Sequence, residues 1–230
     1  MSYNRRMASL RAAVDVVIFA VRERRLSVLL VKRGVPPFRG RWAIPGGFLR
    51  EDEGLEAAAR RELNEETGLT ASFLEQLATF GAPGRDPRGR VLSVCYFALL
   101  PAGNTAVPAP GGDAAQAAWF DVRKLPDLAF DHGDIFEYAL QRLRWKLEWT
   151  TVGFGLVPKR FTLTELQQAF EAVLGRAADK RNFRRKVLGL GVLAATREQK
   201  REGLARPARL YEFSAQRFEK LRERGVLFPF

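Results

Sequence analysis

The 230-residue sequence contains one cysteine and one histidine, and both scarcities exclude classes of chemistry. The single cysteine, Cys95, excludes a disulfide framework and a thiolate metal site, so we expect a cytoplasmic protein. The single histidine, His132, excludes every mechanism that needs two. No run reaches the roughly 18 apolar residues of a membrane span, so no membrane partner is expected. Asp15 interrupts the apolar run at 12–21, which we interpret as a buried strand and not as a secretory signal.

The composition is that of a folded globular protein, with 47% hydrophobic and 28% charged residues. At roughly 150 residues per domain, the length predicts one domain and a smaller second one. The net charge of +12 is uneven, because residues 151–230 contain 17 basic and 8 acidic residues, a net charge of +9. This basic segment is a candidate nucleic-acid-binding module. A protein that is rich in arginine throughout would show the same excess, so both interpretations stay open.

Residues 1–150 alternate between strand and helix patterns. Apolar runs bounded by turn residues predict strands at 12–21, 26–31, 42–45, 74–80, 91–100 and 117–121. Apolar spacings of three and four predict helices at 54–67 and 134–149, the first of them ended by Gly68. The Pro, Gly and Ala residues of 101–112 predict a surface loop. This mixed order predicts an α/β fold of the sandwich type.

A different pattern follows residue 150. Residues 151–160 contain glycines and a proline, and we interpret them as a linker to a second domain at 161–230. Thr162 and Glu165 form a capping box before a helix at 163–174, and Asp179 precedes a second helix at 180–190. Further along, the pattern predicts a two-stranded wing and a final helix, at 191–195, 210–213 and 214–224. The order predicts a winged helix-turn-helix domain.

Three glutamates occupy one face of the first predicted helix. Glu62, Glu65 and Glu66 lie at positions i, i+3 and i+4, where like charges repel one another. The last helical turn also disfavours anions because of the helix dipole. A divalent cation between the carboxylates would relieve both costs, and all-oxygen ligation indicates Mg²⁺, with Mn²⁺ as an alternative. An exposed acidic helix end is the structural alternative.

The residues around these glutamates match a known pattern. The spacing Gly47-x5-Glu53-x7-Arg61-Glu62-Leu63-x-Glu65-Glu66-x-Gly68-Leu69 agrees with every fixed position of the Nudix box. The chain therefore resembles the Nudix hydrolases. The resemblance implies that residues 1–150 form an α/β/α sandwich that hydrolyses a nucleoside diphosphate linked to another moiety. It implies that Glu62 and Glu66 bind metal and that Glu65 is a further ligand or base.

The same resemblance implies roles for three more residues of the box. It makes the Gly46 carbonyl a backbone metal ligand. It also makes Glu53 and Arg61 the pair that holds the geometry of the loop and helix, with Arg61 orienting a glutamate.

Substrate contacts are less sharply marked. The segment "LAFDH" at 128–132 and the segment "RDPRGR" at 85–90 resemble parts of ADP-ribose-type Nudix proteins. Asp131, His132, Arg85 and Arg88 are therefore candidate substrate-binding residues. A helix cap at Asp131, a buried His132 and an exposed hairpin of arginines are the alternatives. A later acidic residue that completes the site is left open among Asp113, Asp121, Asp127, Asp131 and Glu137.

The second helix of the terminal domain has one apolar and one basic face. Phe183, Val187 and Leu190 form the apolar stripe, and Asn182 could contact an adenine edge. Apolar anchoring together with cations for phosphates is what a DNA recognition helix needs. The candidate DNA-binding residues are Lys180, Arg181, Asn182, Arg184, Arg185, Lys186 and, in the wing, Arg206. A solvated basic helix in a dimerisation module is the alternative.

The resemblance extends over nearly the whole chain. The segments "FTLTELQQAFEAVLG", "DKRNFRRK" and "RPARLYEF" resemble the NrtR family of Nudix-related transcriptional regulators. This implies a homodimer that binds double-stranded operator DNA, with ADP-ribose or a related nucleotide as effector. Because no position of the Nudix box is eroded, we also predict hydrolysis of ADP-ribose to AMP and ribose 5-phosphate. The alternatives are a repressor that senses ADP-ribose without turnover, and a plain hydrolase with a terminal dimerisation module.

Overall fold

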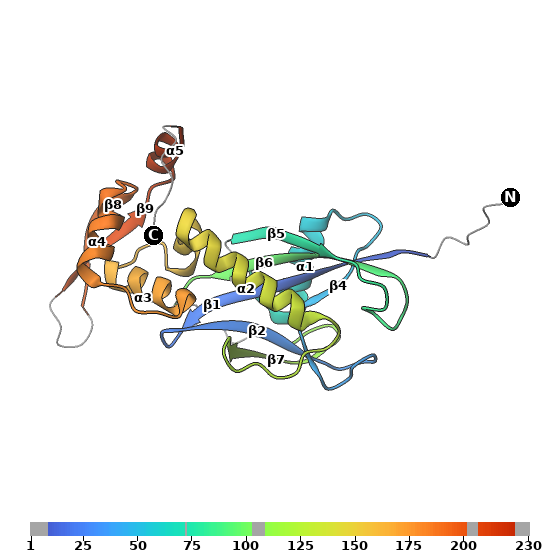
Figure 1. The fold of residues 1–230 in the computed structure, drawn as a ribbon. Helices are drawn as coiled ribbons and strands as arrows, with labels where there is room; N and C mark the ends of the chain where they lie inside the picture. Colours follow the sequence, from blue (N-terminus) through green and yellow to red (C-terminus); the bar gives the residue numbers. More distant parts are fainter. Residues whose placement is uncertain (1–8, 72, 103–108, 202–206, 224–230) are drawn as a thin grey trace. The chain divides into compact units, whose positions relative to one another are not determined.

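A computed structural model describes residues 9–71, 73–102, 109–201 and 207–223 (Figure 1). The chain forms two compact units. The first comprises residues 1–19, 28–98 and 106–139, and the second comprises residues 20–27, 99–105 and 140–230. The predicted domain limits at residues 150 and 161 remain a prediction. In the described part of the chain, no helix is both long and apolar enough to cross a membrane.

The first unit is built on a seven-stranded sheet with the order β3-β2-β1-β6-β5, in which β4 pairs with β1 and β7 with β2. Its strands are β1 (Arg11–Arg22), β2 (Arg25–Arg33), β3 (Trp42–Ala43), β4 (Gly46–Phe48), β5 (Phe73–Phe80), β6 (Val91–Leu100) and β7 (Ala114–Asp121). The central strands β1, β2 and β6 are almost continuously buried, because their sequences are apolar on both faces. Strand β7 begins three residues earlier than predicted.

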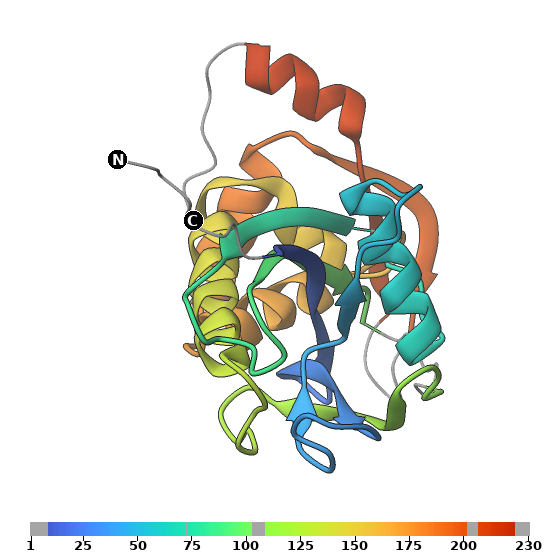
Figure 2. The same ribbon diagram turned by 90° about the vertical axis from the view of Figure 1, so that its right-hand side faces the viewer.

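Two helices, α1 (Leu55–Thr67) and α2 (His132–Trp149), cover opposite faces of this sheet (Figure 2). Helix α1 buries small and aliphatic side chains and ends at Gly68, whose φ of 68° is readily adopted by glycine. Helix α2 packs Phe136 against Phe19 of β1, with ring centroids 6.2 Å apart. This is the predicted α/β/α sandwich.

The second unit contains a winged helix-turn-helix. Its elements are a 3-10 helix η1 (Thr151–Leu156), α3 (Leu163–Leu174), α4 (Lys180–Gly189), β8 (Leu193–Lys200), β9 (Ala208–Phe213) and α5 (Ala215–Glu223). Both hydrogen bonds of the predicted capping box are present at Thr162 and Glu165. Strands β8 and β9 form the wing, and Phe161 adds a bridge to Tyr211. The predicted fold class is therefore confirmed in both parts of the chain.

Aromatic side chains form the core of the second unit. Phe154 stacks on Phe213 at 4.6 Å, and Phe170 meets Phe183 edge to face at 5.4 Å. These contacts connect η1 with the wing and α3 with α4. Part of the segment predicted as a linker thus folds as η1 and contributes buried side chains to this unit.

Candidate functional site

Residues Gly46 and Gly47 of β4 bring backbone into contact with the acidic face of α1. Strand β4 pairs with β1 so that Gly46 lies opposite Asp15. The Gly46 N–H donates to Glu66 Oε2 at 3.0 Å. A Cβ on Gly46 would collide with the backbone carbonyl of Val14 in β1, so glycine is required for this close approach. The structure thus brings Gly46 to Glu66, while the metal-ligand role of its carbonyl stays a prediction.

Arg61 joins the loop to the helix. Its Nε donates to Glu53 Oε2 at 2.8 Å, and its Nη1 donates to Glu62 Oε1 at 2.6 Å and to Glu65 Oε2 at 3.1 Å. The hydrogen bonds from Arg61 lower the pKa of Glu53 to about 2. Arg50 adds an N–H to Glu53 and a guanidinium bond to Glu65. One guanidinium therefore organises three of the carboxylates predicted for this site.

Glu62 and Glu66 are buried, whereas Glu65 is exposed. Burial raises the pKa of Glu62, and it raises the pKa of Glu66 to about 8, a shift reinforced by the charges of Glu62 and Asp15. Buried carboxylates of this kind are hard oxygen donors, and a divalent cation would offset their repulsion. The donor chemistry therefore fits such a cation.

The glutamate side chains of α1 do not adopt the arrangement of a metal site. Among the described residues, no three His, Cys, Asp or Glu side chains converge closely enough to hold an ion. Arg61 and Arg50 hold the carboxylate oxygens of Glu62 and Glu65. Metal ligation by these glutamates therefore remains a prediction.

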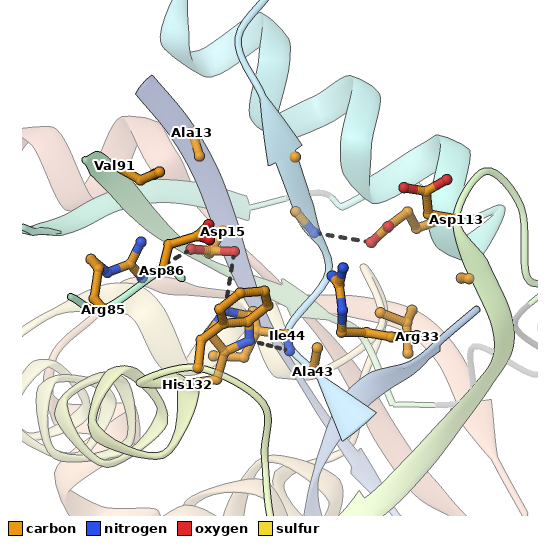
Figure 3. A pocket seen from close by; sticks show the side chains of 16 residues that line it. Ala13, Asp15, Arg33, Ala43, Ile44, Arg85, Asp86, Val91, Asp113 and His132 are labelled. Atoms are coloured by element: carbon orange, nitrogen blue, oxygen red, sulfur yellow. Dashed lines mark hydrogen bonds and ion pairs between the residues drawn. The ribbon is translucent and has the colours of Figure 1, made fainter. Parts of the chain in front are cut away.

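Two cavities meet at β4 and share Arg33, Gly46, Gly47, Glu66 and Asp113. The larger, of about 290 Å³, is also lined by Glu62, Glu65, Arg50, Arg61 and Arg88. The smaller, of about 50 Å³, is lined on its far side by Asp15, Arg85, Asp86 and His132 (Figure 3). The acidic face of α1 thus opens into a cavity that continues into a second, smaller one.

Three of the four predicted substrate-binding residues line these cavities. Arg85 lines the smaller cavity and donates two hydrogen bonds to Asp131, at 2.8 and 2.6 Å. Asp131 does not line the cavity itself but orients Arg85. His132 Nδ1 accepts the Ile44 N–H at 2.9 Å, and burial lowers the pKa of His132. Arg88 borders the larger cavity. Their contacts with a substrate remain predictions.

Several residues at the site were not among the sequence-based candidates. Asp15 is buried in β1, accepts a hydrogen bond from Ser93 Oγ and lies 3.6 Å from His132 Nε2. An acidic residue inside an apolar strand was the available signal. Phe130 has a φ of 53°, and its ring lies 5.0 Å from the Arg33 guanidinium. No sequence pattern indicates such a conformation for phenylalanine.

Of the acidic residues left open by the sequence, Asp113 lines both cavities. Asp121 accepts hydrogen bonds from Arg123, and Asp127 and Glu137 are exposed on other parts of the surface. Asp131 supports Arg85. Of these candidates, Asp113 is therefore the one that lines the same cavity as the α1 glutamates.

Helix α4 presents its basic side chains as the sequence pattern indicates. Asp179 caps it by accepting the Asn182 N–H at 2.7 Å, and Phe183 and Val187 are buried. Five of the residues predicted to contact DNA are exposed, namely Lys180, Arg181, Asn182, Arg185 and Lys186. Arg184 differs, because its Nη2 donates to Thr164 Oγ1 of α3 at 3.1 Å. Arg206 lies outside the described residues.

Ion pairs connect the wing with the rest of its unit. Lys200 of β8 pairs with Glu165 of α3 at 2.6 Å. Arg160 pairs with Glu198 at 2.5 Å and with Glu212 at 2.8 Å. These bonds fix the wing beside α3, and they show that not every cation of this unit points freely into solvent.

The fold and the site define a class of protein: a Nudix-type sandwich with a glutamate-rich helix facing a cavity, followed by a winged helix with a basic second helix. Family comparison agrees, because the NUDIX domain model matches residues 9–139 and the NrtR DNA-binding winged helix domain model matches residues 153–213. The chain belongs to the Nudix family, in the branch that contains an NrtR winged helix domain.

Individual relatives cover both parts of the chain. It is 39% identical to the ADPR responsive transcriptional repressor NtrR of Acinetobacter baylyi, over 94% of this chain and 87% of that protein. It is 40% identical to the ADP-ribose pyrophosphatase of Methanocaldococcus jannaschii, over 58% of this chain and 73% of that enzyme. The crystal structure of Shewanella oneidensis NrtR complexed with a 27mer DNA superposes with a TM-score of 0.76, at 34% identity, over 90% of this chain and 95% of that one.

Proposed function

We propose that this chain is a transcriptional regulator whose Nudix domain binds ADP-ribose and whose winged helix domain binds double-stranded operator DNA. The similarity to an ADPR responsive repressor over almost the whole length supports the pairing of the two functions. Five exposed polar and basic residues on α4 support the DNA-binding part. A homodimer would present two such helices to a two-fold symmetric operator. The protein acts in the cytoplasm.

The same Nudix domain hydrolyses ADP-ribose to AMP and ribose 5-phosphate. The observation that carries this proposal is the pair of buried carboxylates, Glu62 and Glu66, that line the larger cavity beside Gly46 and Gly47 of β4. A water oxygen bonds to one phosphorus, and a P–O bond of the pyrophosphate bridge breaks. The proton of that water passes to a carboxylate. Glu65 lines the cavity and is the carboxylate that accepts it.

Glu62 and Glu66 would hold Mg²⁺, or Mn²⁺, with Glu65 and the Gly46 carbonyl as further ligands. When bound, such a cation neutralises the pyrophosphate, polarises phosphorus and lowers the pKa of water. Glu53 keeps Arg61 in place, and Arg61 orients Glu62. Arg85, Arg88 and His132 contact the substrate, with Asp131 orienting Arg85.

One observation favours a second function, binding of ADP-ribose without turnover. Arg61 and Arg50 neutralise Glu62 and Glu65 in the present conformation, which is compatible with a nucleotide sensor. A plain hydrolase whose terminal domain only dimerises is the third possibility, and DNA binding separates it from the other two.

The test is AMP release from ADP-ribose by the purified chain with and without Mg²⁺. We expect metal-dependent turnover in the wild type and a loss of at least about 100-fold in Glu66→Gln, because a neutral amide is a poor cation ligand. The matched control is Glu56→Gln, an exposed glutamate of the same helix. Turnover that survives in Glu66→Gln contradicts the assignment of Glu66 as a metal ligand. ADP-ribose binding by the wild type without any turnover would favour the second function, a nucleotide sensor.

A further inference from the structure

The smaller cavity surrounds a buried acid for which the hydrolytic mechanism has no use. Asp15 is 7% exposed in the middle of β1. Ser93 Oγ donates to its Oδ2, and Arg85 Nη2 lies 3.8 Å from the same oxygen. Burying a carboxylate costs free energy even when polar groups bond to it. Buried carboxylates of this kind concentrate at binding sites.

The polar groups of this cavity favour hydroxyl groups over phosphates. It is lined by four acidic side chains, Asp15, Glu66, Asp86 and Asp113, but by only two cations, Arg33 and Arg85, and Arg85 is already bonded to Asp131. His132 accepts the Ile44 N–H at Nδ1, so a neutral imidazole has its proton on Nε2, on the side of Asp15. The cavity therefore offers an excess of carboxylate acceptors and an imidazole donor, a set that disfavours an anion and hydrogen-bonds to O–H groups.

The size and position of the cavity limit what it can bind. Its volume of about 50 Å³ has room for about four waters at 10–15 Å³ each, comparable with the hydroxyl edge of one pentose. It shares Gly46, Gly47 and Glu66 with the larger cavity, in which four arginines (Arg33, Arg50, Arg61 and Arg88) match the acidic side chains in number and supply cations for phosphates. One ligand that fills both cavities would place its phosphates beside the arginines and a polyol beside Asp15.

We infer that Asp15, positioned by Ser93 and flanked by Arg85 and His132, binds the hydroxyl groups of the terminal pentose of a nucleoside diphosphate sugar. This inference rests on the proposed function, since it needs the larger cavity to bind the diphosphate. Asp15 is then the residue that distinguishes ADP-ribose from ADP, which has the same nucleoside and diphosphate but no terminal sugar.

The experiment is calorimetric titration of the full chain with ADP-ribose and, separately, with ADP, in a chelator so that no turnover consumes the ligand. We expect the wild type to bind ADP-ribose at least tenfold more tightly than ADP. Asp15→Asn should weaken ADP-ribose binding roughly 10- to 100-fold, the range for loss of a charged hydrogen bond, and change ADP binding less than about twofold. Asp121→Asn is the matched control, because its carboxylate bonds Arg123 away from the cavity.

Each other result has a defined meaning. Equal weakening of both ligands by Asp15→Asn, or an undiminished preference for ADP-ribose, overturns the pentose site. A wild type that binds both ligands equally also overturns it but leaves the proposed nucleotide function standing. A wild type that binds neither ligand, in the chelator or after Mg²⁺ is restored, overturns both. If Asp15→Asn does not fold, Ser93→Ala decides, since it keeps the carboxylate and removes its buried donor: we expect a three- to tenfold loss for ADP-ribose alone, and no loss contradicts the inference.

Discussion

At Glu66, burial and hydrogen bonding shift the pKa in opposite directions. The carboxylate accepts one hydrogen bond from the Gly46 N–H, yet burial beside Glu62 and Asp15 raises its pKa to about 8. In the unfolded chain the pKa of a glutamate is near 4.5. Between these two values the folded chain binds more protons than the unfolded chain, so the contribution of Glu66 to stability is lost as the pH rises.

We therefore predict that Glu66→Gln stabilises the metal-free protein at alkaline pH. Each pH unit between 6.5 and 8 should lower the unfolding free energy of the wild type, relative to Glu66→Gln, by up to about 1.4 kcal/mol. The measurement is urea denaturation in a chelator at several pH values, with the exposed Glu56→Gln as control. Parallel pH profiles for the wild type and Glu66→Gln would show that the buried charge has no such cost.

At the same scale, the resemblance to the Nudix box implied that Glu53 pairs with Arg61 and that Arg61 orients a glutamate. The structure contains ion pairs of Arg61 with Glu53 and with Glu62. Asp15 was visible only as an interruption of an apolar run. Its partners Ser93 and His132 lie 78 and 117 residues further along the chain, where no periodicity connects them with it.

Among the elements, α4 is the helix on which the DNA-binding hypothesis depends. The sequence predicted six basic or amide side chains on it as equivalent contacts. The structure separates them, because Arg184 bonds Thr164 of α3 and its Nε is buried, while Arg181 and Lys186 are exposed. Helical spacing alone could not reveal this difference, since it depends on how α3 packs against α4.

We predict that the double variant Arg181→Ala, Lys186→Ala weakens operator binding and reduces the slope of log K against log salt by about 2, one for each phosphate that the variant no longer neutralises. Its thermal stability should equal that of the wild type, whereas Arg184→Ala should melt at a lower temperature because it lacks the bond to α3. Gel-shift titrations over a salt series measure the first effect. Arg142→Ala, an exposed arginine of the same unit, is the control.

An unchanged salt slope in the double variant would contradict the assignment of α4 to DNA. Equal stability of Arg184→Ala and the wild type would show instead that the Thr164 bond contributes nothing to the packing of α3 on α4.

For the whole molecule, a nucleotide domain and a DNA-binding domain in one chain predict linked equilibria. If ADP-ribose changes the affinity for operator DNA by some factor, DNA must change the affinity for ADP-ribose by the same factor. Both affinities are measured by fluorescence anisotropy and calorimetry in a chelator, which keeps the ligand intact. We expect a factor of roughly 5 to 150, the usual range of allosteric coupling. A factor of one in both directions would mean that the domains act independently.

The sequence by itself determined the order of the elements apart from β4 and η1, the helix limit at Gly68, the capping box at Thr162 and the basic face of α4. These features depend on residues within one or two helical turns of one another, so local periodicity and capping specify them. Only the tertiary structure decided which distant groups meet. Arg85 reaches Asp131 across 46 residues, and Ile44 reaches His132 across 88. Such contacts follow from the pairing and register of strands and from the packing of α2 on the sheet, and no local pattern records them.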